Sequence, residues 1–274
     1  MNKLEAYKMD GLGNDFIIFD KREKSLSLTK NQIIRMSDRS NIGCDQVIII
    51  DRDKDNNPIL TFYNSDGGEI AACGNGSRCV AYLLMKEKNI KSISLKTKDR
   101  ILKAEMKNDL VNINMGYPEF DWEKIPLYKK MDNKNLKIKI KKNNGKEIEG
   151  GFSLSVGNPH VIFFVENINE YDLEKIGPQI ENHKYFPEKC NVTFANIIDK
   201  NHIKVKVWER GAGLTKACGT AACATAVSAA SLKLANRSLD IEFEKGSINI
   251  DWNLNNIIYM TGEISKIKKI IVDI

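Results

Sequence analysis

Hydrophobic positions along the chain fall mostly into short runs that are typical of β-strands. Four short runs are rich in β-branched and aromatic residues, which favour strands; they are 17–19, 47–50, 59–63 and 161–165. Apolar and polar residues alternate in four others, as in strands with one buried face; these are 92–96, 111–115, 203–208 and 248–252. The pattern therefore predicts a protein built mainly from strands.

Two longer segments, 74–88 and 219–235, have helical character instead. Both lack internal proline and are rich in residues such as alanine and leucine, which favour helices. In the second, residues 221–227 leave little polar surface on any face, and a helix that is apolar nearly all round is normally buried. We therefore expect two buried helices, each surrounded by strands.

The chain also repeats itself at a nearly constant offset, which indicates a duplicated structural unit. The tripeptide Ala-Cys-Gly at 72–74 recurs at 217–219, which is an offset of 145 residues. Two more pairs follow the same order: 13–19 with 157–163 at offset 144, and 44–46 with 190–192 at offset 146. We therefore predict an α+β fold of two pseudo-symmetric lobes, each of mainly antiparallel strands wrapped around a central buried helix.

The junction between the lobes is expected near residue 118, where Pro118 and Pro126 interrupt the pattern. The N-terminal lobe would then span 1–118 and the C-terminal lobe 119–262. A last strand near the end of the chain has no evident place in the second lobe, so residues 263–274 could return to the first.

Composition and charge narrow the class of protein. Apolar residues make up 42% and charged residues 28%, as in globular domains. The net charge of +6 is spread along the chain, whereas a nucleic-acid-binding protein gathers its positive charge on one face. Its densest basic stretch, 136–142, alternates lysine with apolar residues and predicts an exposed strand face. Residues 1–16 hold no signal-peptide pattern and no apolar run reaches about 20 residues, so we expect a cytoplasmic protein without nucleic-acid or membrane partners.

The six cysteines are expected to be thiols, because disulfides are rare in a reduced compartment. They form no CxxC motif and no histidine pair has metal-ligand spacing, so no metal site is expected. We interpret Cys44, Cys79, Cys190 and Cys223 as small residues of the core.

The repeated cysteines, Cys73 and Cys218, are the candidates for chemistry. Each directly precedes a glycine and a predicted helix, whose first N–H groups lack partners within the helix and carry partial positive charge. Such a position lowers the pKa of a thiol and offers N–H donors to a carboxylate. Two such thiols facing one another could take a proton from one face of an α-carbon and return one to the other. The duplication therefore predicts an amino-acid epimerase that uses a thiol pair as acid and base.

Five short motifs, taken in order along the chain, resemble those of a known family. They are Gly-Leu-Gly-Asn-Asp-Phe at 11–16, Cys-Gly-Asn-Gly at 73–76, Gly-Asn-Pro-His at 157–160, Glu-Arg-Gly at 209–211 and Ala-Cys-Gly-Thr at 217–220. Together they closely resemble diaminopimelate epimerase, from residue 8 to residue 224 and on through the second helix. The resemblance implies interconversion of LL- and meso-diaminopimelate without cofactor or metal, in the biosynthesis of lysine and peptidoglycan precursors. It also suggests a homodimer.

Roles transfer from the family position by position. Cys73 and Cys218 match the catalytic thiols, and His160 and Glu209 match positions that tune them. The amides that hold the reacting carboxylate match Gly74, Asn75, Gly219 and Thr220. Residues that bind the rest of the substrate match Asn14, Gln46, Asn64, Asn158, Asn191, Glu209 and Arg210. Asp10, Leu214 and Ala221 depart from the family's usual residues, but none replaces a group with an assigned chemical role.

Two alternatives remain open. A proline or hydroxyproline racemase of the same fold would also use two thiols, but its cyclic substrate has no distal carboxylate for Arg210 to bind. A non-enzymatic binding protein of this fold would need neither both Cys-Gly helix starts nor Arg210. A redox-active dithiol protein would cycle Cys73 and Cys218 reversibly without exchanging an α-proton.

Overall fold

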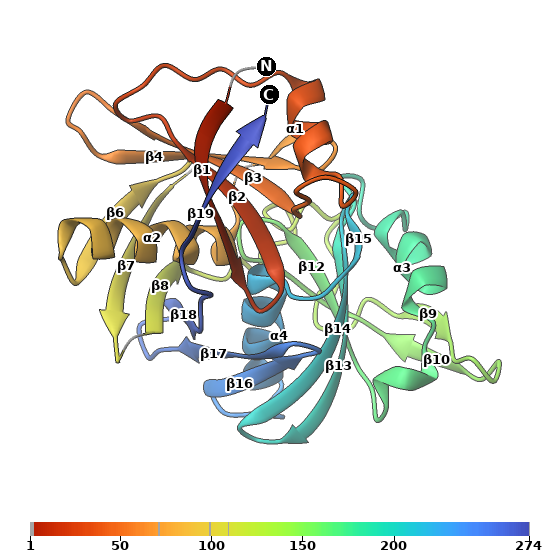
Figure 1. Ribbon diagram of the computed structural model, residues 1–274. Coiled ribbons are helices and arrows are strands. Elements are labelled where there is room, and N and C mark those ends of the chain that lie inside the picture. The colour runs from red at the N-terminus through yellow and green to blue at the C-terminus, as the bar shows by residue number, and fades with distance from the viewer. Residues whose placement is uncertain (1–2, 71, 99, 109, 274) are drawn as a thin grey trace. The chain divides into compact units, whose positions relative to one another are not determined.

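The computed structural model describes residues 3–70, 72–98, 100–108 and 110–273. The chain forms two compact units, which comprise Met1–Asn114 with Thr261–Ile274 and Met115–Met260 (Figure 1). Residues 1, 2 and 274, at the ends of the predicted N-terminal lobe, lie outside the described residues. No helix in the described part of the chain is long and apolar enough to cross a membrane.

The first unit consists of strands around one long helix. Its elements are β1 (Lys3–Gly11), β2 (Asn14–Asp20), α1 (Lys30–Ser37), β3 (Gln46–Arg52), β4 (Pro58–Asn64), β5 (Glu69–Ile70), α2 (Gly74–Lys88), β6 (Ser92–Lys96), β7 (Ile101–Lys107), β8 (Leu110–Gly116) and β19 (Lys268–Asp273). Strand β2 pairs in parallel with β3, and β4 with β6. The pairs β1–β2, β3–β4, β6–β7 and β7–β8 are antiparallel, and β19 pairs with β1 from Lys3↔Asp273 to Lys8↔Lys268.

The second unit repeats this order of pairing. Its elements are β9 (Ile138–Lys141), β10 (Glu147–Gly150), β11 (Phe152–Ser155), β12 (Pro159–Phe164), η1 (Ile168–Glu170), α3 (Leu173–Glu181), β13 (Asn191–Asp199), β14 (His202–Glu209), β15 (Gly213–Thr215), α4 (Gly219–Ser231), β16 (Ser238–Phe243), β17 (Gly246–Trp252) and β18 (Ile258–Gly262). Strand β12 is parallel to β13 and β14 to β16, whereas β11–β12, β13–β14 and β16–β17 are antiparallel. The duplicated topology confirms the predicted α+β class with two pseudo-symmetric lobes.

The two predicted helices are the buried centres of their units. Helix α2 packs against β1, β2, β6 and β7, and helix α4 against β11, β12, β13, β16 and β17. In α4 all residues from Ala221 to Ala229 are buried, as expected for a helix without a polar face. The predicted C-terminal end of α4 at residue 235 is wrong. The helix ends at Ser231, and Lys233 then adopts a left-handed conformation (φ 59°) that no glycine or asparagine signalled in the sequence.

Helices α1 and α3 were not predicted. Each connects a parallel pair of strands, β2 to β3 and β12 to β13, and a parallel pair requires a crossover connection that is usually helical. The local signal was present for α1, because Thr29 and Gln32 form a capping box. The predicted exposed strand at 136–142 is confirmed as β9, in which Lys139 and Lys141 are exposed and Ile138 and Ile140 buried.

Candidate active site

Cys73 lies immediately before the first turn of α2. Its backbone is extended (φ −134°, ψ 119°), and its Sγ accepts a hydrogen bond of 3.4 Å from the backbone N–H of Gly76. A Cβ at Gly76 would lie 2.7 Å from Cδ1 of Ile48 in β3, so the absence of a side chain lets this turn approach the sheet. The thiol is partly exposed at the helix N-terminus, where partial positive charge favours an anion.

Three polar side chains form a hydrogen-bonded series that begins at this thiol. The Sγ of Cys73 lies 3.8 Å from Oδ1 of Asn14, which also accepts a 3.4 Å hydrogen bond from Nδ2 of Asn75. Asn75 in turn accepts a 2.9 Å hydrogen bond from the guanidinium of Arg78, a side chain with 0% exposure. Arg78 was not predicted; an arginine inside an otherwise apolar helix segment was the signal that could have revealed it.

A second set of charges fixes the other side of Asn14. Its Nδ2 donates to Asp45 at 3.0 Å, and Arg39 pairs with both Asp45 and Asp15 at 2.6 and 2.8 Å. Burial by itself would raise the pKa of Asp15, but hydrogen bonds from Arg39 and Lys8 outweigh it and lower this pKa to about 2. Asp15 is therefore ionised at neutral pH, and Asp45, which pairs with Arg39, holds the Asn14 amide in one orientation.

Gln46 and Asn64 are direct neighbours across the β3–β4 pair. The Nε2 of Gln46 donates a 3.1 Å hydrogen bond to Oδ1 of Asn64. The other amide atom, Gln46 Oε1, is buried and accepts no hydrogen bond from the described residues. A buried acceptor without a partner costs free energy, so a donor such as an ammonium group would be favourable there.

Cys218 lies at the equivalent position before α4, but the residue is only 6% exposed. Its Sγ is 3.5 Å from the hydroxyl of Thr220. Burial, and after it the negative charge of Glu209, raise the pKa of Cys218 well above its usual value, although Thr220 acts in the opposite direction. The expectation that the helix start lowers this thiol's pKa is therefore wrong for Cys218, because loss of solvation outweighs the helix dipole.

His160 is completely buried in β12 and contacts a substrate-binding candidate rather than a thiol. Its Nε2 lies 2.9 Å from Oδ1 of Asn158, an acceptor, so the ring proton is on Nε2. Nδ2 of Asn158 in turn points to the hydroxyl of Thr220 at 3.5 Å. Burial, with a smaller contribution from Arg210, lowers the pKa of His160 to about 3. His160 is therefore neutral and orients the Asn158 amide.

The neutral state of His160 predicts a pH dependence of stability. A histidine in the unfolded chain has a pKa of about 6.5. Between this pH and a pH of about 3, the folded protein therefore binds fewer protons than the unfolded chain does. The stabilisation is complete above pH 6.5 and is lost as the pH falls, by up to about 1.4 kcal/mol per pH unit. We expect the free energy of unfolding, measured in urea from about pH 7 to pH 4.5, to fall less steeply in His160→Gln than in the wild type. Equal slopes would contradict the assignment.

Asn191 and Arg210 meet at the ends of β13 and β14. Oδ1 of Asn191 accepts a 3.0 Å hydrogen bond from the backbone N–H of Arg210, and its Nδ2 donates to the carbonyl of Pro159. The guanidinium of Arg210 donates through Nη1 to the carbonyl of Glu188 at 2.9 Å, and the residue is exposed. A guanidinium has five N–H donors, so Arg210 retains donors for a carboxylate.

The structure thus gathers most of the predicted site residues into one cluster in each unit. The first cluster contains Asn14, Cys73, Gly74 and Asn75, and Gln46 and Asn64 form a separate hydrogen-bonded pair on β3 and β4. The second cluster contains Asn158, His160, Asn191, Glu209, Arg210, Cys218, Gly219 and Thr220. Glu209 accepts a 2.6 Å hydrogen bond from the hydroxyl of Thr215 and hydrogen-bonds the Cys218 thiol. In the described part of the chain, no group of three histidine, cysteine or carboxylate side chains could hold a metal ion.

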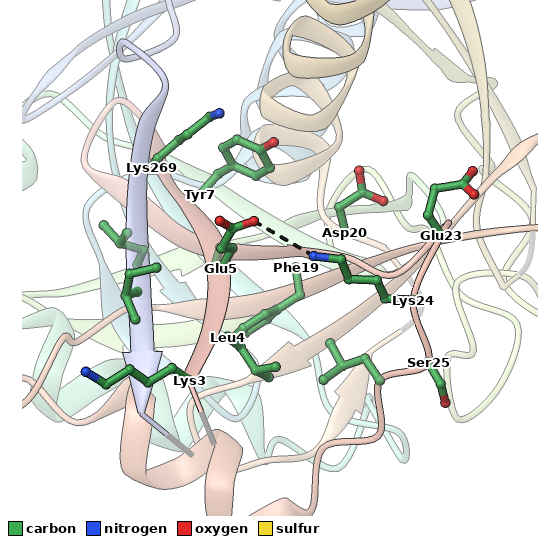
Figure 2. A pocket seen from close by; sticks show the side chains of 14 residues that line it. Lys3, Leu4, Glu5, Tyr7, Phe19, Asp20, Glu23, Lys24, Ser25 and Lys269 are labelled. Carbon is green, nitrogen blue, oxygen red and sulfur yellow. Dashed lines mark ion pairs between the residues drawn. The ribbon is translucent and has the colours of Figure 1, made fainter. Parts of the chain in front are cut away.

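A separate open pocket of about 770 Å³ lies beside β1, the end of β2 and β19. Figure 2 shows Glu5 and Lys24, which form an ion pair at 4.0 Å, on its wall. Tyr7 and Lys269 also line it. None of the lining residues belongs to either cluster, so the candidate chemistry does not take place in this pocket.

Comparison with solved structures identifies the class of fold. A PhzF-family phenazine biosynthesis protein from Bacillus anthracis superposes with a TM-score of 0.70 at 16% identity, covering 100% of both chains. A hydroxyproline epimerase from Agrobacterium vitis superposes with a TM-score of 0.68 at 12% identity, covering 100% of this chain and 92% of that chain. At these identities the likeness shows a shared fold and nothing more.

Comparison of sequences identifies the family. The sequence model described as diaminopimelate epimerase matches residues 6–120 and 152–267. A diaminopimelate epimerase from Pelagibacter ubique (strain HTCC1062) is 54% identical over 269 residues, which cover 97% of this chain and 98% of that protein. The chain therefore belongs to the diaminopimelate epimerase family of isomerases, and the resemblance drawn from its motifs is confirmed.

Proposed function

We propose that this protein interconverts LL- and meso-2,6-diaminopimelate by a two-cysteine acid/base reaction, in lysine and peptidoglycan precursor biosynthesis. The observation that carries the proposal is that Cys73 and Cys218 occupy the same position, immediately before the central helix, in two repeated units. Family membership and the polar residues around each thiol support it.

In this reaction a thiolate removes the α-proton from one face of the substrate. The electron pair left on the α-carbon is delocalised into the α-carboxylate, and the thiol on the opposite face then delivers its own proton. The backbone N–H groups of Gly74, Asn75, Gly219 and Thr220, at the two helix starts, are suited to stabilise the extra negative charge on the carboxylate. One thiol becomes a thiolate as the other is protonated. After each turnover the two cysteines have therefore exchanged their acid and base roles.

The raised pKa of Cys218 makes it the proton donor in the resting protein. Cys73 then acts as the base for the configuration that binds first. In the reverse direction Cys218 must lose its proton, and Glu209, whose carboxylate hydrogen-bonds this thiol, is placed to accept it. His160 supports the site indirectly, through Asn158.

The remaining polar residues would bind the far end of diaminopimelate. Arg210 is suited to the distal carboxylate, because a guanidinium forms two parallel hydrogen bonds with a carboxylate. The buried acceptor on Gln46 is suited to an ammonium group. The amides of Asn14, Asn64, Asn158 and Asn191 would bind the other polar atoms. A proline-type racemase would need neither Arg210 nor this set of amides.

We also propose that the protein acts in the cytoplasm as a homodimer and needs no bound cofactor. The six cysteines, all among the described residues, are thiols, which supports a reducing compartment. The dimer is inferred from the family resemblance, and sedimentation at micromolar concentration tests it.

The test of function is turnover of LL-diaminopimelate by purified protein. After dialysis against a chelator and treatment with hydroxylamine, which removes pyridoxal phosphate, the protein should still form meso-diaminopimelate at its original rate. Parallel incubations with L-proline and trans-4-hydroxy-L-proline should give no epimer. Activity that returns only with added metal or pyridoxal phosphate, or turnover of the cyclic substrates alone, would overturn the proposal.

A further inference from the structure

Glu181, the last residue of α3, hydrogen-bonds both ends of the segment that carries Arg210. Its Oε2 accepts from the indole Nε1 of Trp208 at 2.7 Å, and its Oε1 accepts from the backbone N–H of Gly211 at 3.2 Å. The first and last residues of 208–211, hereafter the 208–211 segment, therefore donate hydrogen bonds to the same carboxylate. Both Glu209 and Arg210 lie between these two contacts.

The position of this carboxylate is unfavourable for the helix itself. The C-terminal end of a helix carries partial negative charge, so an acidic residue there is destabilising. The last turn of α3 contains no basic residue, and the side chain of Glu181 is only 7% exposed. Lys189 approaches at 3.8 Å and offsets part of the cost. The remaining compensation comes from the two hydrogen bonds to the 208–211 segment.

Packing also joins α3 to the segment. A Cβ at Gly177 would lie 2.5 Å from Cγ of Trp208, so α3 lies directly against the indole at this point. At the six-membered part of the same ring, a Cβ at Gly213 would lie 3.6 Å from Cη2. The indole is thus confined, and its N–H is directed at Glu181.

The backbone that carries the Arg210 side chain is held by two hydrogen bonds, one to Asn191 and one to Glu181. Arg210 is exposed, and the hydrogen bonds described for it are those from its backbone to Asn191 and from Nη1 to the carbonyl of Glu188. Two parallel hydrogen bonds with a carboxylate require the guanidinium plane in one orientation. An exposed arginine keeps that plane only if its backbone is held, and Glu181 holds the backbone at the next residue, Gly211.

We propose that Glu181 is a positioning residue for substrate recognition, which holds the 208–211 segment so that Arg210 pairs with the distal carboxylate of the substrate. The inference rests on the proposed function, because it gives Arg210 that role. Glu181 itself touches neither the substrate nor a thiol in this scheme.

The first test is Glu181→Gln, which preserves size but leaves one acceptor oxygen for two donors. We expect KM for LL-diaminopimelate to rise about tenfold, because a buried donor loses its partner. The value of kcat should change by less than about threefold, since Glu181 contacts neither thiol and the Glu209 carboxylate keeps its own hydrogen bond from Thr215. Glu174→Gln is the matched control, because Glu174 is an exposed carboxylate on the same helix. It should leave both constants unchanged. An unchanged KM in Glu181→Gln would overturn the proposal.

A double-mutant cycle with Arg210→Ala separates positioning from general destabilisation. If Glu181 acts through Arg210, Glu181→Gln should reduce kcat/KM by less than about twofold in the Arg210→Ala background. If the losses of kcat/KM in the two single variants instead multiply in the double variant, Glu181 is merely structural. If Arg210→Ala alone has no effect, the role of Arg210 in the proposed function fails instead.

Trp208→Phe keeps the test decisive if Glu181→Gln does not fold. It removes the indole N–H donor while retaining an aromatic ring, and thermal melting reports whether it is folded. We expect a rise in KM of about threefold in the wild-type background, from the loss of one hydrogen bond, and none with Arg210→Ala. An unchanged KM in folded Trp208→Phe, or a rise that persists with Arg210→Ala, would also contradict the proposal.

Discussion

Replacing either Cys73 or Cys218 with alanine is expected to reduce epimerisation by a factor of more than about 10³, because a missing acid or base removes an entire proton-transfer step. Each inversion needs one thiol on each face of the α-carbon, so neither single variant can complete it. Formation of meso-diaminopimelate from the LL isomer, followed by chiral chromatography, measures the loss.

Deuterated water distinguishes two bases from one in the wild-type enzyme. The incoming hydrogen originates from the second thiol, which exchanges with solvent before substrate binds, so early product should carry deuterium. The abstracted proton remains on the first thiol while water is excluded, so unreacted substrate should carry almost none. Return of the original proton to the product, with label in substrate and product together, would indicate a single base.

Cys79→Ala and Cys223→Ala are matched controls, because both cysteines are buried in the same two helices. They should retain epimerase activity, with at most a modest loss of stability. Epimerisation at wild-type rate by both Cys73→Ala and Cys218→Ala would refute the two-thiol mechanism.

Arg210→Ala is expected to lower kcat/KM for diaminopimelate by about tenfold to several hundredfold, as for the loss of a charge-assisted hydrogen-bonded pair. The reason is that the distal carboxylate would lose its only proposed cationic partner. Steady-state kinetics with both isomers measure the effect.

Two variants sharpen this prediction. Arg210→Lys retains the charge without the planar pair of donors, so it should recover part of the activity and not all of it. Lys206→Ala removes an exposed cation from the same strand and should leave kcat/KM unchanged. If Arg210→Ala matches the wild type, or if Lys206→Ala is equally impaired, the distal carboxylate is not bound by Arg210.

The sequence by itself determined the duplication and the family to which the chain belongs. The offset of 145 residues between Cys73 and Cys218 and the apolar segments that follow them were enough to predict two buried helices, each preceded by a cysteine. Such features are visible in sequence because they depend on local hydrophobic pattern and on the order of residues along the chain.

Only the tertiary structure decided how the site is supported. Helices α1 and α3 exist because β2–β3 and β12–β13 are parallel, and strand direction is not encoded in a local pattern. Burial raises the pKa of Cys218 and makes His160 neutral, since solvation depends on everything packed around a group. The contacts of Glu181 with Trp208 and Gly211 were equally invisible. Glu181 and Trp208 belong to different elements, and only folding brings a buried charge and its partners together.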